Sequence, residues 1–182
     1  MKTISDHVLD IVQNSVAAKA TLIEIVVTED EPKDFYELDF KDNGCGMNEA
    51  TLQQAANPFF TTRNTRRVGL GIPLLKHNAT VANGKFEICS EEGKGTRVKA
   101  KFQLSHIDRP PVGDIWDSLY LIIVSNPEIR IIYNHRTPDG TFGLDSDRLM
   151  QILDGVPLKH GEIKRAVIDL VKNNLEEINA SK

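Results

Sequence analysis

Apolar residues at the start of the chain recur at the spacing of an α-helix. Between Ile4 and Val16 they return every three or four positions, which places them on one face of a helix. The pattern predicts an amphipathic helix from Ser5 to about Ala18. Ser5 is its predicted N-cap, because a serine side chain can accept a hydrogen bond from the free N–H groups of the first turn.

The pattern then changes to the alternation that is typical of β-strands. Residues 21–28 (TLIEIVVT) and 35–42 (FYELDFKD) are two such runs, and the polar segment 29–34 joins them. In the second run apolar and polar side chains alternate, so one face is expected to be buried and the other to be in water. These residues predict a hairpin that ends at Asp42.

A second helix and a second hairpin follow. Residues 69–83 predict a helix that opens on glycines, after a polar region with a short helix around 49–56. Residues 84–90 and 96–102 flank a glycine-containing turn, and the second run alternates between apolar and basic side chains. They predict a hairpin that closes this part of the chain near Leu104.

The sequence changes character at residues 105–114 (SHIDRPPVGD), which predict a linker or a sharp turn. Helical spacing returns in residues 115–123. A further hairpin is predicted over 128–144, and two helices are predicted over 146–154 and 159–178.

The composition sets limits on the function. The chain has 182 residues, 40% of them hydrophobic, which suffices for one globular domain, or for one domain and a small appendage. The formal net charge of −4 gives no general electrostatic reason to bind nucleic acid or an anionic membrane surface. We therefore expect no nucleic-acid partner, and we expect any anionic ligand to be held by a local site.

No apolar run approaches the length of a membrane-spanning helix, and acidic residues stand where a signal peptide would have its apolar stretch. We expect a cytoplasmic protein without membrane insertion. Cys45 and Cys89 lack the spacing of a zinc site or a disulfide framework, so we predict that both are packing residues. His106, His135 and His160 are scattered singly and are predicted to be surface or turn residues.

Asp42 is the first candidate for chemistry. It ends a predicted strand and precedes Gly44 and Gly46, so the backbone can turn tightly and a flat group can approach it. A fixed carboxylate at this place could accept a hydrogen bond from an exocyclic amine such as that of adenine. Asp-Asn-Gly is also a common turn sequence, so the tripeptide alone favours a simple turn.

The glycines at 69 and 71 open the second predicted helix. The N-terminus of a helix is a ready site for phosphate, because its free N–H groups and its dipole point at the ligand. An isolated Gly-x-Gly is a weak signal, and a simple junction between a loop and a helix is the alternative.

The first helix carries a polar stripe opposite its apolar one. Asp10 and Asn14 are four residues apart, and the small residue Ala17 continues the stripe. A hard cation such as Mg²⁺ prefers oxygen ligands and keeps several waters, so one asparagine oxygen and substrate phosphates could place it. A solvated polar face is the alternative.

Five segments follow one another along the chain: an acidic residue with Asn14 and then Ser-x-x-Ala on the first helix, Asp-x-Gly-x-Gly at 42–46, Pro-Phe-Phe-Thr-Thr at 58–62, Gly-Leu-Gly at 69–71, and Gly-x-Gly-Thr at 93–96. In this order they resemble the ATP-binding domain of the GHKL superfamily, which groups gyrase, the large heat-shock chaperones, histidine kinases and mismatch-repair ATPases. Segments 58–63 and 91–102 look most like the catalytic domain of sensor histidine kinases, and the first helix is also similar to that of mismatch-repair ATPases. The resemblance covers roughly residues 5 to 104.

The resemblance implies a fold and a division of the chain. The fold is α+β, a two-layer α/β sandwich of the Bergerat type with helices on one face of a mixed sheet. Residues 1–104 would form a histidine kinase-like ATP-binding domain, and residues 105–182 a small α+β C-terminal extension packed on it. This extension carries no motif that we recognise. Its Trp116 is most simply a core residue, with a partner surface as the alternative.

The resemblance also implies the ligands, MgATP, and the residues that bind them. The implied ATP-binding residues are Asn14, Asp42, Gly44, Gly46, Met47, Phe60, Thr61, Thr62, Arg63, Gly69, Leu70, Gly71 and Thr96. Asn14 would coordinate Mg²⁺. Asp42 would accept the adenine amino group, with Thr96 helping through a water molecule. Residues 57–68 would form a lid with Phe59 and Phe60 as its hinge, and the amides of residues 69–71 would bind the phosphates.

Three positions depart from the family pattern. The family's catalytic acid is most often glutamate, and Asp10 is one methylene shorter, so a general base here would need another rotamer or a second water. Arg67 and Val68 stand where Gly-Thr often precedes Gly-Leu-Gly, which could offer an arginine to the phosphates. Ala17 stands where histidine kinases often have a basic residue.

His7 is a candidate phosphoacceptor by residue type only, because it lies within the predicted ATP-domain helix and lacks the flanking pattern of a phosphohistidine segment. No long helical hairpin precedes residue 5. We therefore expect the histidine-bearing dimerisation domain of a sensor kinase to be absent.

Two functions are compatible with these residues. The first is a protein kinase that phosphorylates histidine, serine or threonine of a partner in trans, with Asp10 orienting or deprotonating the acceptor. The alternative is a nucleotide-gated regulatory module that binds a partner protein with little or no catalysis. An ATP-driven DNA-processing clamp is disfavoured, because the chain has no basic surplus and no transducer domain.

Overall fold

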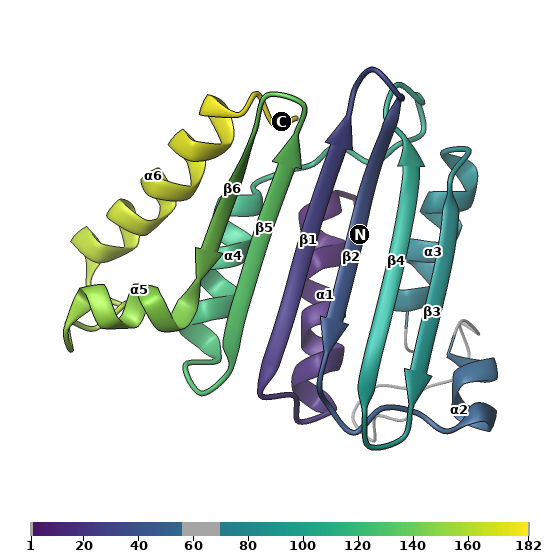
Figure 1. Cartoon of the computed structure of the whole chain (residues 1–182), viewed down its shortest axis with the longest axis horizontal. Coiled ribbons are helices and arrows are strands. Elements are labelled where there is room, and N and C mark those ends of the chain that lie inside the picture. Colours follow the sequence, from purple (N-terminus) through teal and green to yellow (C-terminus); the bar gives the residue numbers. More distant parts are fainter. Residues whose placement is uncertain (1, 56–69, 182) are drawn as a thin grey trace.

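The chain folds into a mixed six-stranded sheet with helices packed against it (Figure 1). This computed structural model describes residues 2–55 and 70–181. The strands, in spatial order, are β3 (Lys85–Glu91), β4 (Gly95–Gln103), β2 (Phe35–Asp42), β1 (Leu22–Asp30), β5 (Arg130–Thr137) and β6 (Gly140–Asp145). The helices are α1 (Ile4–Ala17), α2 (Glu49–Gln54), α3 (Gly71–Val81), α4 (Ile115–Ser125), α5 (Ser146–Leu153) and α6 (Gly161–Glu177). The predicted fold class, an α+β sandwich with a mixed sheet, is confirmed.

The sheet runs without a break from the first part of the chain into the second. β1 pairs antiparallel with β2, and on its other side it pairs parallel with β5, with Ile25 opposite Tyr133. β2 pairs with β4, β4 with β3, and β5 with β6, all antiparallel. The predicted C-terminal hairpin therefore extends the main sheet, and buried residues of both parts form one hydrophobic core. The division into two domains at residue 104 stays a prediction.

The alternation in the strands decides which face of the sheet carries the helices. Ile23, Ile25 and Val27 of β1 are fully buried on the face that α1, α3 and α4 cover behind the sheet in Figure 1. The residues between them lie on the open face, which is polar on the neighbouring strands. There the Arg97 guanidinium lies 2.6 Å from a carboxylate oxygen of Asp39, so charges of opposite sign meet across paired strands.

The N-cap of α1 is one correction to the sequence prediction. Thr3 is the N-cap, and its side chain accepts a hydrogen bond from the Asp6 N–H while the Asp6 carboxylate accepts one from the Thr3 N–H. Ser5 is instead buried in the first turn, where its N–H donates to the carbonyl of Val112. The predicted linker therefore lies against the start of α1 and supplies acceptors for that helix end.

The predicted environments of three isolated residues are also wrong. Cys45 and Cys89 are exposed rather than packed, because Cys45 lies in a loop and Cys89 points to the open face of the edge strand β3. His135, predicted at the surface, is only 1% exposed, because β5 lies between two strands of the sheet and the helices cover its inner face. Trp116 is partly buried against the core, as the simpler interpretation of that residue predicts.

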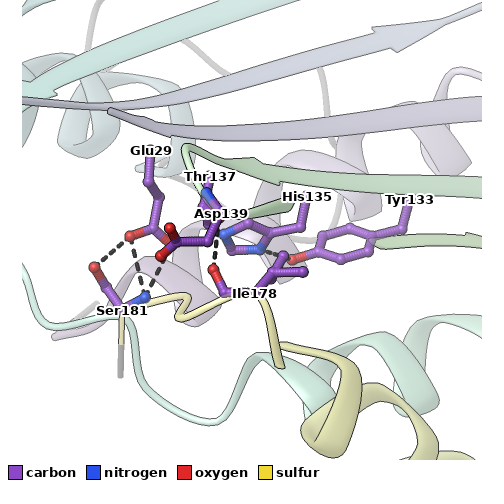
Figure 2. A network of polar contacts seen from close by, with 7 residues as sticks. All are labelled: Glu29, Tyr133, His135, Thr137, Asp139, Ile178 and Ser181. Atoms are coloured by element: carbon purple, nitrogen blue, oxygen red, sulfur yellow. Dashed lines mark hydrogen bonds and ion pairs between the residues drawn. The ribbon is translucent and has the colours of Figure 1, made fainter. Parts of the chain in front are cut away.

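The last residues of the chain attach to the far end of β1 through a buried polar network (Figure 2). His135 Nε2 lies 2.6 Å from Glu29 Oε1, and His135 Nδ1 lies 2.6 Å from the Tyr133 hydroxyl. Ser181 donates its N–H and its hydroxyl to the same Glu29 carboxylate. A histidine ring that donates from Nε2 to Glu29 and accepts at Nδ1 from the Tyr133 hydroxyl satisfies both of these partners.

Within residues 2–55 and 70–181, none of the helices has the length and apolar character needed to cross a membrane. The same part of the chain holds no cluster of three or more His, Cys, Asp or Glu side chains arranged to bind a metal ion.

Candidate functional site

Asp42 ends β2 on the helix-covered side of the sheet, and three elements hold its carboxylate. The Ser15 hydroxyl of α1 donates to Oδ2 at 2.7 Å. The Gly44 N–H and the Thr96 N–H donate to Oδ1 at 2.9 and 3.3 Å. The carboxylate is half-buried, and its Oδ2 accepts only one of these three bonds. A carboxylate oxygen has two lone pairs, so Oδ2 can accept another donor that approaches along the loop.

The loop after Asp42 packs tightly between α1 and the β3–β4 turn. The Cys45 N–H donates to the carbonyl of Ala18 at the end of α1, and the Gly93 N–H donates to the carbonyl of Cys45. Gly46 has a φ of +64°, and a Cβ there would lie 2.0 Å from the carbonyl oxygen of Glu91. Only glycine fits this position, because another residue would be strained and would collide with backbone.

Gly95 has the same role on the opposite side of the loop. Its φ is +98°, and a Cβ there would lie 1.9 Å from the carbonyl oxygen of Asp42. The glycine therefore lets β4 come close to the end of β2 and brings Thr96 opposite Asp42 in the sheet register. The second glycine of the Gly-x-Gly-Thr motif is therefore explained by the close approach of its backbone to that of Asp42.

Ser90 joins the loop to Thr96. Its hydroxyl donates to the Gly95 carbonyl at 2.9 Å, so it must accept from the Met47 N–H at 2.8 Å and from the Thr96 hydroxyl at 2.9 Å. The Thr96 oxygen then keeps its lone pairs as acceptors beside Asp42. Ser90 thereby fixes two of the predicted site residues, Met47 and Thr96.

A second group of predicted residues meets where α1 faces the start of α3. A Cβ at Gly71 would lie 3.3 Å from Asp10 Cβ, 3.5 Å from Asp10 Oδ2 and 3.7 Å from Asn14 Nδ2. The N-terminus of α3 is therefore next to Asp10 and Asn14 of the polar stripe of α1. The N-cap Leu70 makes no capping bond through its side chain, and it is 46% exposed. The first N–H groups of α3 can thus serve an anion.

The two groups are joined through α1, because consecutive residues of this helix take part in both. Asn14 faces Gly71, and Ser15 bonds to Asp42. The described residues that the sequence assigned to ATP or to catalysis are Asp10, Asn14, Asp42, Gly44, Gly46, Met47, Leu70, Gly71 and Thr96. Phe60, Thr61, Thr62, Arg63 and Gly69, together with the rest of the predicted lid, lie outside the described residues.

Sequence reasoning missed the roles of Ser15, Ser90 and Gly95. Ser15 was visible within the motif on the first helix, but its partner Asp42 is 27 residues away. Ser90 belongs to no motif, and only the strand register, which places it opposite Thr96, shows its role. The pairing of β3 with β4 was predictable as a hairpin, so this contact could have been found by aligning the two strands.

A separate hollow of about 540 Å³ lies over the ends of the strands. Its lining includes Asp42, Ser90 and Thr96, but most of its walls are open-face side chains such as Glu24, Lys41, Asp39 and Arg97. Those charges pair with one another, and neither Asp10, Asn14 nor Gly71 lines it. We therefore do not place the candidate site in this hollow.

Bacterial sensor proteins are similar in sequence to this chain. A sensor protein of Shewanella frigidimarina (strain NCIMB 400) is 36% identical over 102 residues, a match that covers 55% of this chain and 16% of that protein. The sensor histidine kinase YxdK of Bacillus subtilis (strain 168) is 31% identical over 90 residues, covering 47% of this chain and 27% of that kinase. The chain thus spans between 16% and 27% of the length of these two relatives.

Solved structures share the fold at low sequence identity. The N-terminal domain of a DNA repair protein superposes with a TM-score of 0.54 and 18% identity, covering 80% of this chain and 52% of that one. The Aquifex aeolicus MutL ATPase domain complexed with ADP gives a TM-score of 0.50 and 15% identity, covering 85% and 70%. The profile of the histidine kinase-, DNA gyrase B- and HSP90-like ATPases matches residues 2–106, which is more than half of the chain. Together with the order of the motifs and the fold, this match shows that the chain belongs to that family of ATPases and carries its ATP-binding domain.

Proposed function

We propose that the chain binds MgATP in the site between α1, the loop after β2, the start of β4 and the start of α3, and that it phosphorylates a partner protein in trans. The observation that carries the proposal is the unused acceptor capacity of Asp42 at one end of the site, with the N-terminus of α3 against Asp10 and Asn14 at the other. An adenine nucleotide has an exocyclic amine at one end and phosphates at the other, which matches this arrangement.

In the proposed complex Asp42 Oδ2 accepts the adenine amino group. Ser15, Gly44 and Thr96 already hold the carboxylate, so little reorganisation is needed when the base arrives. The Thr96 hydroxyl, which Ser90 orients, is placed to accept from a water molecule beside the base. This assigns the base end of the site to residues that the sheet holds in place.

At the phosphate end the free N–H groups of the first turn of α3 bind anionic oxygens. The amide oxygen of Asn14 is a suitable ligand for Mg²⁺, since this ion prefers oxygen donors and keeps several waters. When bound, Mg²⁺ would neutralise charge on the phosphates. Predicted contacts from Thr61, Thr62 and Arg63 would belong to this end as well.

For the transfer itself, an oxygen or nitrogen of the acceptor side chain attacks the γ-phosphorus. The bond between that phosphorus and the β–γ bridging oxygen breaks, and ADP leaves with the electron pair. Asp10 orients the acceptor and takes the proton that the acceptor group loses. The acceptor is a histidine, serine or threonine of a second protein.

The test is calorimetric titration of the protein with MgATP, with Asp42→Ala and Asp42→Asn in parallel. Removing a charged acceptor should cost on the order of 1.5 to 3 kcal/mol, which is roughly a tenfold to hundredfold loss of affinity. Wild-type protein that does not bind, or an Asp42→Ala variant that binds as well as wild type, would reject the proposed site.

The catalytic half of the proposal needs its own test. Transfer of labelled phosphate from ATP to proteins of the source extract should occur with wild type and be lost with Asp10→Asn. Equal labelling by both proteins would remove Asp10 from the mechanism.

The short side chain of Asp10 favours a second candidate, a nucleotide-gated module that binds its partner with little turnover. In that case retention of a partner on immobilised protein should differ between ATP, ADP and no nucleotide, while no phosphate is transferred. Identical retention in all three conditions would exclude this candidate.

A further inference from the structure

His7 extends the polar stripe of α1 away from the site and contacts α3. It lies one helical turn before Asp10 and is 0% exposed. Its Nε2 lies 2.8 Å from Nδ2 of Asn78, a residue of α3. Gly71 of α3 faces Asp10 and Asn14, and Asn78 faces His7, so the two helices run antiparallel with their polar residues in contact.

Because the amide nitrogen of Asn78 faces the ring, the pair has one consistent hydrogen-bond assignment. Asn78 donates from Nδ2 and His7 accepts at Nε2, so the proton of a neutral ring is on Nδ1. His7 Nδ1 is buried and has no hydrogen-bond partner among the described residues. Burial lowers the pKa of His7 to about 4, so the ring is neutral near pH 7 and the bond to Asn78 does not depend on a charge.

A buried ring nitrogen without a partner costs stability, and a leucine in place of His7 would avoid that cost. What the polar pair offers instead is a fixed geometry. The buried residues of α3, which include Leu75 and Ala79, are apolar, and apolar contacts are non-directional. A hydrogen bond fixes a distance and an angle, so it can determine how far α3 is shifted along α1.

The position of α3 along α1 matters because its N-terminus belongs to the site. Asn78 is seven residues after Gly71, which is about two turns, or roughly 10 Å, along a continuous helix. A shift at Asn78 is therefore transmitted to the N–H groups of the first turn. We propose that His7 and Asn78 are positioning residues, which set the phosphate-binding end of α3 against Asp10 and Asn14. This inference rests on the proposed nucleotide site.

The experiment compares two ligands that use different parts of the site. Adenosine occupies only the base end at Asp42, whereas MgATP also needs the start of α3. His7→Leu, Asn78→Leu and the double variant are titrated with both ligands, and the melting temperature of each is recorded. Thr80→Val is the matched control, because Thr80 is an exposed residue of α3 near Asn78.

Each single variant should weaken MgATP binding about tenfold and leave adenosine binding within about twofold, because only the phosphate contacts move. The double variant should be no weaker than the single ones, because the two residues act as one unit. His7→Gln, whose amide can still bond to Asn78, should restore much of the wild-type ratio of MgATP affinity to adenosine affinity. Thr80→Val should bind both ligands as wild type does.

An unchanged ratio of MgATP to adenosine affinity, with only the melting temperature lowered, would overturn the inference and leave a purely structural pair. If a leucine variant does not fold, Asn78→Ser, whose side chain is too short to reach His7, decides by the same ratio. Wild-type protein that binds neither ligand would reject the proposed nucleotide site, and this inference with it. Failure of the inference alone is recognised by wild-type binding of both ligands.

Discussion

Two carboxylates lie on the helix-covered side of the sheet, at opposite ends of the β1–β2 hairpin. Asp42 is the last residue of β2, the strand whose arrow points to the lower edge of Figure 1, and Glu29 is the residue before the last in β1, whose arrow points to the upper edge. Both accept hydrogen bonds from backbone and side-chain donors of other elements. They differ in their exposure and in their remaining capacity to accept hydrogen bonds. Asp42 is half-buried and its Oδ2 can accept a further hydrogen bond, whereas Glu29 is 5% exposed.

The donors around Glu29 come from the chain itself and use both oxygens. His135 and the Ser181 N–H reach Oε1, and the Ser181 N–H and hydroxyl reach Oε2 (Figure 2). Burial raises the pKa of Glu29, but the hydrogen bonds from His135 and Ser181 outweigh it, so its pKa lies below the ordinary value. A well-bonded carboxylate is therefore not by itself a ligand site. Access and an unused lone pair distinguish the end with Asp42 from the end with Glu29.

The largest expected effect is on the backbone that shapes the Asp42 end. In Gly95→Ala the new Cβ would collide with the Asp42 carbonyl at a φ that strains alanine, so unfolding free energy should fall on the order of 4 kcal/mol. Nucleotide binding should be lost as well, because Asp42 and Thr96 would move apart. Chemical denaturation and MgATP titration measure the two effects.

Gly161→Ala is the control for this substitution, because a Cβ added at Gly161 of α6 would have no heavy atom within 4 Å beyond its own helix backbone and chain neighbours. It should be neutral or slightly stabilising, by less than about 1 kcal/mol. Comparable losses of stability in both variants would contradict the argument from close backbone approach.

The next largest effect is expected at the Glu29 end of the β1–β2 hairpin. Glu29→Gln removes the negative charge and replaces one of the two acceptor oxygens that serve His135 and Ser181 with an NH₂ donor, so it should lower the unfolding free energy by about 3 kcal/mol, with MgATP affinity unchanged. Asp42→Asn should do the opposite, with a large loss of affinity and a smaller loss of stability. Urea unfolding and calorimetry on both variants test the contrast, which fails if Glu29→Gln weakens nucleotide binding as much as Asp42→Asn.

The free energy of unfolding should also decrease in two separate steps as the pH is lowered. The folded pKa of His7, about 4, is below its ordinary value of 6.5, so between these values the unfolded chain binds a proton that the folded chain does not. Lowering the pH from 6.5 to 4 should therefore remove up to about 3 kcal/mol, and His7→Leu should flatten that range.

The Glu29 step lies at lower pH. Because its folded pKa is lowered from 4.5, its contribution is complete above 4.5 and is lost only as the pH falls through the lowered value. Glu29→Gln should remove this acid step and leave the His7 step in place. Denaturant titrations at a series of pH values separate the two, and one common step that both variants abolish would be inconsistent with this assignment.

The smallest effect is expected on the open face of the sheet. Arg97 pairs with Asp39 at 2.6 Å, next in sequence to Thr96, but it is exposed to water. Arg97→Met should change the unfolding free energy by less than about 1 kcal/mol, because solvent and salt screen such pairs. MgATP affinity should stay at the wild-type value. A clear loss of affinity would mean that the site extends through the sheet to the open face.

The sequence by itself determined the elements and their order. Hydrophobic periodicity located the helices and strands, because side chains with a 3.6 or 2.0 residue repeat can bury one face only in the matching structure. The spacing of Asn14, Asp42, Gly71 and Thr96 within ordered motifs led to the family and to the ATP-binding fold. Their assigned roles in nucleotide binding stay predictions until the titrations are made.

Only the tertiary structure decided how distant segments meet. The parallel pairing of β5 with β1, the burial of His135 and the contact of Ser181 with Glu29 depend on strand order, which local patterns do not encode. The same holds for the bonds from Ser15 to Asp42 and from His7 to Asn78, which join residues 27 and 71 positions apart. Periodicity tells each segment which face to bury, whereas the partner that covers the face is selected by packing of the whole chain.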